Sequence, residues 1–496
     1  MENTMRTATK EEIETLSAQI KEYALSYGLD PFDVVFELVD FDEMSEIAAY
    51  DGFPQRYLHW RFGMEYERLS KSYTYGLSKI YELVINTNPA VAFLMTNNTI
   101  VDQKLVIAHV YAHSDFFKNN MWFKGTNRKM ADDMAMHASR IYRYINKYGH
   151  DVVEEFIDKV LSLENLIDYH WKPPTYKVKQ SEEEYTASGI KKFKAEGYME
   201  IFVNPPELLL EEEKKKKEEL KTRKEKFPIE PAKDVLLFLM ENAPLELWQE
   251  DIISIIREEA YYFVPQALTK IMNEGWAAFW HEKILTEKAL KDHELIDFAE
   301  HHAGVLQWHP GSLNPYKLGY ELFKDIEERW NKGRFGKEYE ECEDLEKKKN
   351  WDLHLGLGLQ KIFEVRKIYS DVLFLDEFLT DEFCKKYKLF VYKYNRDTGK
   401  YEITSRNFND IKRILLRRFT NLGHPIIIIV DANYENRGEL YLLHKYEDWE
   451  LDYPEAKETL KNLQYIWRRP VHLETVISER RILLSYNGKE YVEKYL

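Results

Sequence analysis

The sequence predicts a mainly α protein, with a large helical N-terminal domain followed by a smaller α+β C-terminal domain. Apolar residues recur at the i, i+3, i+4 spacing of amphipathic helices through most of the chain before residue 370. After that point, short β-branched and aromatic runs alternate with turn signals. With 496 residues, 44% of them hydrophobic, the chain is long enough for two or three domains.

Within the helical part, the pattern predicts two blocks separated by a charged insert. Residues 211–219 alternate glutamate and lysine blocks, which indicates an exposed helix or a linker over 206–232. The helical domain therefore has a first half at 1–205 and a second half at 233–370. Its helices are expected at 11–27, 62–85, 102–116, 129–148, 152–169, 233–241, 245–260, 265–290, 292–304 and 315–332.

The C-terminal domain, residues 371–496, is expected to contain a small sheet. Asp397-Thr398-Gly399 predicts a hairpin turn, and Arg437-Gly438 predicts a second one. We identify no catalytic cluster in this domain. Its strands are expected at 389–392, 401–404, 425–430, 440–443, 470–476 and 481–486, with helices at 410–420 and 454–467.

Composition and charge argue against several functional classes. The net charge is -16, so no excess of positive charge is available to neutralise phosphates, and we expect no nucleic-acid partner. The two cysteines, Cys342 and Cys384, and an N-terminus without the apolar core of a signal peptide are typical of a cytoplasmic protein. No run approaches the roughly 18 apolar residues that a membrane span requires.

The most informative stretch is the apolar run 104–117, in which His109 and His113 lie four residues apart. On a helix, residues at i and i+4 are neighbours on one face. Helical metalloenzymes use this spacing to hold a divalent ion between two imidazoles. The pair therefore predicts a divalent metal site, with zinc as the expected ion, and the alternative is a packed pair of core histidines.

Glu274 is the candidate for a third ligand. It belongs to the string Asn-Glu-Gly-Trp-Ala at 273–277. A helical Asn-Glu-Gly-aromatic-Ala string carries the glutamate ligand in a large class of zinc peptidases, the zincins, far in sequence from the histidine helix. Two imidazoles, a carboxylate and an open fourth position form a catalytic zinc geometry. Such an ion lowers the pKa of a bound water and polarises a carbonyl.

Three other histidines are candidates of lower priority. His281 follows Glu274 by seven residues, two turns along the same helical face, and is predicted as a further metal ligand or a substrate contact. His302 lies at an expected helix end, where it either joins the site or interacts with the helix dipole. His137 lies in a following helix, and a structural role is expected for it.

The general base of the zinc peptidases has no counterpart at its usual position. Their helix reads His-Glu-x-x-His, and Val110 stands in the place of the glutamate here. Asp115, Glu258, Glu259 and Glu37 are the candidate catalytic carboxylates. Glu258 and Glu259 precede an aromatic cluster at 261–263, and a carboxyl group buried against rings acquires a raised pKa that suits proton transfer.

A second metal arrangement uses the same histidines. His109, His113 and three glutamates on helices, Glu37, Glu258 and Glu274, would form a di-iron carboxylate site in a helical bundle. The Glu-x-x-His pairs that are usual in such bundles are missing from this sequence, which favours the zinc interpretation.

Several strings along the chain point to a family. They are Asp-Gly-Phe-Pro at 51–54 with His-Trp at 59–60, and residues 76–86, 108–120, 270–277, 302–304 and 468–474. Together they resemble the SpoVR family, the stage V sporulation protein R family, over nearly the whole chain. The resemblance implies a role in building the spore cortex or, in bacteria that form no spores, in stress physiology. It also implies association with a PrkA-type serine protein kinase and a von Willebrand A-type protein.

Two hypotheses of function follow. In the first, the protein is a cytoplasmic zinc-dependent hydrolase of the peptidase or amidase type, with its ion held by His109, His113 and Glu274. In the second, it is a non-catalytic regulatory or scaffold protein that works with the kinase and the von Willebrand A-type partner. A catalytic site keeps an open metal position, whereas a structural site is closed by four protein ligands.

Overall fold

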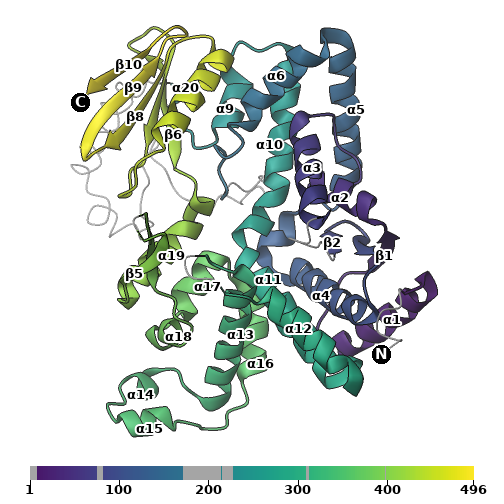
Figure 1. Cartoon of the computed structure of the whole chain (residues 1–496). Coiled ribbons are helices and arrows are strands. Elements are labelled where there is room, and N and C mark those ends of the chain that lie inside the picture. Colours follow the sequence, from purple (N-terminus) through teal and green to yellow (C-terminus); the bar gives the residue numbers. More distant parts are fainter. Residues whose placement is uncertain (1–7, 75–81, 171–213, 215–226, 309–311, 397) are drawn as a thin grey trace, which may run out of the picture. The chain divides into compact units, whose positions relative to one another are not determined.

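The computed structural model describes residues 8–74, 82–170, 214, 227–308, 312–396 and 398–496. Its contacts divide the chain into two compact units, each assembled from two segments: Met1–His150 with Tyr261–Gly423, and Asp151–Ala260 with His424–Leu496. Helices dominate, and the largest sheet lies near the C-terminal end of the chain, which confirms the predicted fold class (Figure 1). None of the described helices has the length and apolar character that a membrane span requires.

The first unit is mainly helical. Its α-helices include α1 (Lys10–Ser26), α2 (Phe41–Ala49), α3 (Trp60–Thr74), α4 (Ile100–Asn119), α5 (Met130–Tyr148), α11 (Lys270–Ile284), α12 (Leu295–Val305), α13 (Pro315–Lys332), α14 (Lys337–Glu340), α15 (Leu345–Lys349), α16 (Gly358–Ile368), α17 (Asp371–Phe378), α18 (Asp381–Lys386) and α19 (Phe408–Phe419). Helix α10 (Leu247–Leu268) begins in the second unit and ends in the first.

A three-stranded sheet interrupts the helices of the first unit. The parallel strands β1 (Val34–Val39) and β3 (Ala90–Met95) pair with each other, and β2 (Glu82–Ile85) is antiparallel to β3. The prediction that this part of the chain is entirely helical, with one helix over 62–85, is therefore wrong. Helix α3 ends at Thr74, and residues 83–85 are a short β-branched and apolar run that pairs with the buried β3 instead of extending a helical stripe.

Helix α4 lies in the core of the first unit and has almost no exposed face. Thr99 begins it with a capping box, in which its side chain accepts from the backbone N–H of Asp102 and the Asp102 carboxylate accepts from Thr99. Nearly every residue from Val101 to Phe117 is buried, polar side chains included. Polar side chains on α4 therefore need partners inside the protein, as Gln103 has in the backbone oxygen of Met95 on β3.

Helices α11 and α13 cross at a pair of glycines. A Cβ added to Gly275 would lie 2.3 Å from the carbonyl carbon of Gly319, and one added to Gly319 would lie 2.0 Å from the carbonyl oxygen of Ile271. No side chain fits at either position, so the two backbones are in direct contact. The glycine of the Asn-Glu-Gly-Trp string is therefore required by helix packing.

The second unit combines helices with a five-stranded sheet of order β10-β9-β8-β7-β6. Helix α20 connects β7 to the parallel β8 and packs against β8 and β9. The predicted strands and the hairpin at Arg437-Gly438 are confirmed, and β10 was not predicted. The elements are α6 (His150–Leu161), α9 (Val235–Asn242), α20 (Tyr453–Trp467), β6 (Ile427–Tyr434), β7 (Glu439–His444), β8 (Val471–Ile477), β9 (Arg480–Tyr486) and β10 (Tyr491–Tyr495).

Residues 371–423 belong by contact to the first unit, whereas the sequence had grouped them with the C-terminal sheet. Strands β4 (Val391–Asn395) and β5 (Lys400–Ser405) do form the predicted hairpin, but they make a separate two-stranded sheet. The predicted linker at 206–232 lies mostly outside the described residues. The predicted boundaries at 205, 232 and 370 stay predictions.

Candidate metal centre

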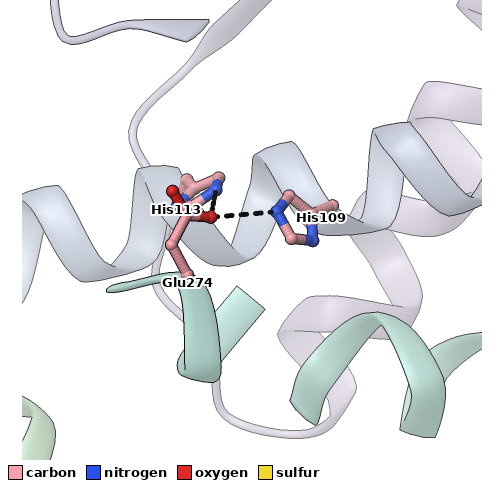
Figure 2. A group of neighbouring side chains, drawn as sticks. All are labelled: His109, His113 and Glu274. Carbon is pink, nitrogen blue, oxygen red and sulfur yellow. Dashed lines mark ion pairs between the residues drawn. The ribbon is translucent and has the colours of Figure 1, made fainter. Parts of the chain in front are cut away.

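The structure brings His109, His113 and Glu274 together between α4 and α11. The Glu274 carboxylate lies between the two imidazoles, with its Oε2 atom 3.4 Å from His113 Nε2 and 3.7 Å from His109 Nε2 (Figure 2). All three residues are buried, and one ligand atom from each lies within 4.8 Å of the other two. Among the described residues, this is the group of histidine, cysteine and acidic side chains with the spacing to hold a metal ion.

His113 is oriented by the residue that precedes Glu274. Its Nδ1 atom lies 2.9 Å from the side-chain oxygen of Asn273, which accepts a hydrogen bond. This contact favours the tautomer with its proton on Nδ1, in which Nε2 keeps the lone pair that a metal binds. Metal-binding histidines almost always donate their other ring N–H to an oxygen in this way.

His109 is oriented by two histidines on other helices. Its Nδ1 atom lies 2.9 Å from His281 Nδ1, and His281 Nε2 lies 2.9 Å from His302 Nδ1. Both ring nitrogens of His281 are thus engaged, and the group of ligand atoms does not include it. His281 contacts the Nδ1 atom of His109, whereas Glu274 faces its Nε2 atom. The structure therefore does not bring His281, a predicted metal ligand, into the group of ligand atoms.

One carboxylate oxygen of Glu274 is hydrogen-bonded, and the other has no hydrogen bond among the described residues. Lys270 Nζ donates to Oε1 at 2.6 Å. Oε2 is buried and has no hydrogen-bond partner among the described residues, because both imidazole distances exceed the usual range for N–H···O bonds. Leaving a buried carboxylate oxygen unpaired costs free energy, and a cation bound at this point would remove that cost.

The electrostatics of the cluster favour the protonation states that a metal requires. Burial, together with the neighbouring His113, lowers the pKa of His109 to about 4. Burial alone would raise the pKa of Glu274, but the facing imidazoles of His109 and His113 hold it well below its usual value. Near neutral pH, the cluster is therefore a neutral imidazole at His109 and an ionised carboxylate, which are the forms that bind a metal.

The donor set fits zinc. Two imidazole nitrogens and one carboxylate oxygen are the protein ligands of a well-known type of catalytic zinc site, in which a fourth position stays open. His281, the predicted fourth ligand, is hydrogen-bonded on both nitrogens and lies outside the group of ligand atoms, so the described residues supply three ligands. The Lys270 side chain that contacts the carboxylate is 55% exposed, which puts solvent within one side-chain length of the buried cluster.

Asp115, a predicted catalytic carboxylate, is held in a different set of contacts. It is fully buried and pairs with Arg366 of α16. Its Oδ2 accepts from Trp276 Nε1 at 2.9 Å, and its Oδ1 accepts from the backbone N–H of Asp30 at 2.7 Å. This carboxylate links α4, α11 and α16, and the structure does not bring it into the metal cluster.

The other predicted carboxylates also lie outside the group of ligand atoms. Glu258 is exposed and Glu259 is buried, and both lie on α10. Glu37 is exposed and lies in strand β1, so the di-iron arrangement, which required it on a helix, is wrong at this residue. His137 is buried on α5, where a structural role was expected.

Sequence reasoning predicted the three residues that the structure brings together but missed the residues that support them. In the string at 273–276, Asn273 orients His113, Glu274 faces both imidazoles, Gly275 permits the contact with α13, and Trp276 binds Asp115. Lys270, the first residue of α11, donates to the Oε1 atom of Glu274. Their position beside a predicted ligand was the available signal.

The sequence also predicted no catalytic cluster in the C-terminal domain, and the sheet holds a hydrogen-bonded row that resembles one. His472 Nδ1 lies 2.8 Å from Ser485 Oγ, and His472 Nε2 lies 2.8 Å from Glu439 Oε2. His472 and Ser485 are direct partners across β8 and β9, and Arg437 binds both oxygens of Glu439. Every polar end is paired, so we assign this row to sheet stability.

These features define a class: a largely helical protein with a buried two-histidine, one-glutamate cluster on two helices distant in sequence. The chain belongs to the SpoVR family. The family described as "SpoVR like protein" matches residues 7–424, and the one described as "SpoVR-like C-terminal domain" matches 425–478. That division falls beside the division between the compact units at Gly423 and His424.

A relative with a curated sequence has the same extent as this chain. It is described as "Uncharacterized protein YcgB" of Escherichia coli (strain K12) and is 31% identical over 490 residues, which cover 92% of this chain and 90% of the relative. No solved structure matches the chain. The family membership is thus confirmed, and the chemistry has to be argued from the site.

Proposed function

We propose that this protein is a cytoplasmic zinc-dependent hydrolase that acts on a peptide or amide bond. The observation that carries the proposal is the buried Oε2 of Glu274, which has no hydrogen-bond partner among the described residues and faces the Nε2 atoms of two histidines. The three atoms converge on one point, and a cation there satisfies all of them.

The residues around that point have separate tasks. His109, His113 and Glu274 would hold the ion, which, when bound, supplies an acidified water and a polarised carbonyl. Asn273 and Lys270 fix the orientation of the His113 ring and of the Glu274 carboxylate through the atoms that face away from the ion. Because the backing contacts are already made, the ligands need no rearrangement to bind.

The missing general base supports a second candidate function, the regulatory or scaffold role. Val110 replaces the base of the zinc peptidases, and the carboxylate of Asp115 is bound by Arg366 and Trp276. In this case the ion is structural, and the chain works with a PrkA-type serine kinase and a von Willebrand A-type partner in sporulation or stress physiology. The group offers three protein ligands among the described residues, whereas a closed structural site has four, and this supports the hydrolase.

The first test is elemental analysis of the protein purified without chelator. We expect about one zinc per chain, because the described residues contain one group of three side chains that could hold a metal. The variants His113→Ala and Glu274→Ala should lose the ion, and His137→Ala, a buried histidine on α5, is the matched control that should keep it. Circular dichroism of each variant establishes that loss of metal is separate from loss of fold.

A second measurement separates the two candidate functions. The zinc-loaded protein is assayed against peptide and amide substrates, including cell-wall peptides, with Glu274→Ala as the blank. Turnover that disappears in the blank supports the hydrolase. A folded wild-type protein that takes up no divalent metal, even on reconstitution, would refute the metal site and with it the enzyme proposed.

A further inference from the structure

Three histidines from three helices form one hydrogen-bonded row that starts at the metal site. The row runs from His109 on α4 through His281 on α11 to His302 on α12, and the ring centroids are 5.1 Å apart at each step. His281 is fully buried, and His302 is half-buried and stacks on Phe298. Neither His281 nor His302 belongs to the group of ligand atoms.

With both contacts hydrogen-bonded, a row of three neutral imidazoles has two possible proton arrangements. In the outward arrangement each ring donates away from the metal site, and in the inward arrangement each ring donates toward it. In each contact one nitrogen carries the proton and the other accepts, and a neutral ring carries a single proton. If His109 has its proton on Nδ1, then His281 must accept on Nδ1 and carry its own proton on Nε2. His302 then accepts on Nδ1 and carries its proton on Nε2.

Occupancy of the metal site selects between the two directions. A metal on His109 Nε2 requires the lone pair there, so the His109 proton resides on Nδ1 and the row donates outward. Without a metal, the Glu274 carboxylate 3.7 Å from His109 Nε2 attracts a proton to that nitrogen, and the row donates inward.

We propose that His281 and His302 are positioning residues that lock the His109 ring for metal binding, and that metal binding reverses the proton direction of the whole row. The inference rests on the proposed metal site. All three rings stay neutral in both states. The proton displaced from His109 Nε2 leaves at the metal end, one proton shifts across each hydrogen bond, and one enters at His302 Nε2, so the row neither gains nor loses protons.

Two substitutions at His281 separate hydrogen bonding from packing. In His281→Gln, the amide oxygen accepts from His109 and the amide nitrogen donates to His302, which preserves the outward direction. In His281→Leu, neither bond forms. Loss of such supporting hydrogen bonds lowers metal affinity by about 10–100-fold. We therefore expect His281→Leu to bind zinc that much more weakly and His281→Gln to bind close to wild type.

The direct readout is the tautomer of His302. Protein with isotope-labelled histidine is compared with and without zinc by NMR, in which the ring nitrogen and carbon shifts distinguish the two neutral tautomers. The resonances of His302 are identified by their absence in His302→Gln. We expect the proton to move from Nδ1 to Nε2 when zinc binds. The matched control is His301→Gln, on the same helix α12 as His302. The His301 imidazole pairs with Asp102 of α4 and lies outside the row.

The outcomes distinguish the failure of this inference from failure of the proposed site. If wild-type protein binds no zinc, the metal site itself is refuted. If zinc binds but the His302 tautomer is the same in both states, or His281→Leu binds zinc as tightly as wild type, the site stands and the positioning row is refuted. If His281→Gln is as weak as His281→Leu, then packing of the ring is responsible, and the hydrogen-bond argument is overturned.

Discussion

Two buried polar clusters of this molecule both contain histidine and glutamate, but only one of them has all these side chains fully hydrogen-bonded. In the five-stranded sheet, His472 is bonded on both nitrogens and Glu439 on both oxygens. Between α4 and α11, Glu274 has a bonded oxygen and a buried one with no hydrogen-bond partner among the described residues. A buried polar cluster in which every group is hydrogen-bonded is explained by its contribution to stability. A buried cluster with one unsatisfied oxygen indicates that a ligand binds there.

The largest expected effect breaks the helix contact that supports the incomplete cluster. Gly275→Ala places a methyl group 2.3 Å from the Gly319 backbone, where neither helix can give way without displacing Glu274. We expect the unfolding free energy to fall by about 3 kcal/mol or more, measured by chemical denaturation. Gly63→Ala on α3, where an added Cβ meets nothing within 4 Å, is the control and should gain about 0.5–1 kcal/mol. Equal stability of the two variants would contradict the packing argument.

The comparison itself is tested by one substitution in each cluster, on metal-free protein. His472→Leu removes the middle of the complete row and strands Glu439 and Ser485, so the unfolding free energy should fall by about 1–3 kcal/mol. Glu274→Gln places an amide N–H₂ where the unpartnered oxygen stood, so stability should stay level or rise while zinc binding is lost. A large loss of stability in Glu274→Gln would mean that its cluster is complete without a metal.

Asp371 is a buried carboxylate at the start of the Glu274 helix, and both of its oxygens are hydrogen-bonded. It accepts from the backbone N–H groups of Ile271 and Met272 at 2.8 and 2.9 Å, at the start of α11. Burial raises its pKa from 3.8 to about 7, more than these bonds lower it. Between about pH 4 and pH 7, Asp371 is therefore protonated in the folded protein and ionised in the unfolded chain.

This raised pKa fixes the sign of a pH dependence. The contribution of Asp371 to stability is fully present below about pH 4 and is lost as the pH rises to about 7, at no more than about 1.4 kcal/mol per pH unit. The difference in unfolding free energy between wild type and Asp371→Asn should therefore shrink across this range, in denaturation curves recorded at each pH. A difference that grows with pH would show that the helix N-terminus holds the ionised form.

The smallest effect concerns the satisfied oxygen of Glu274. Lys270→Met removes the donor to Oε1 while keeping the length of the side chain. Because Lys270 is half exposed, water replaces the lysine at Oε1, so the unfolding free energy should fall by about 1 kcal/mol or less. Zinc affinity should fall by about tenfold, because the carboxylate is no longer oriented. Competition with a chelator measures it, with Lys283→Met on the same helix as the control. An unchanged affinity would remove Lys270 from the supporting set.

Much of this arrangement is predictable from sequence, for identifiable reasons. His109 and His113 lie on one face, as their i, i+4 spacing predicts, because α4 is a single uninterrupted helix. The string that contains Glu274 is helical as predicted. The same local logic failed at β1 and β2, whose short apolar runs acquire their identity from pairing with β3, a contact distant along the chain.

The role of His281 could not be predicted for a similar reason. Spacing shows that it shares a face with Glu274, but a face two turns long reaches both the metal point and the ring behind it. Which of the two it contacts depends on how α4 and α12 lie against α11, and therefore on tertiary packing. Asp115 was a candidate catalytic carboxylate, and its pairing with Arg366, 251 residues later in the chain, is a tertiary contact that the local sequence does not predict.

The exposed ammonium group of Lys270 has a consequence for how the ion would come and go. The Glu274 carboxylate is buried, yet its outer oxygen is bound to a side chain that is 55% exposed and free to rotate into solvent. We expect release of that one contact to let water reach the cluster without separating any helices. Zinc exchange should then be governed by rotation of a single lysine, so a chelator can strip the folded protein and added zinc can restore it.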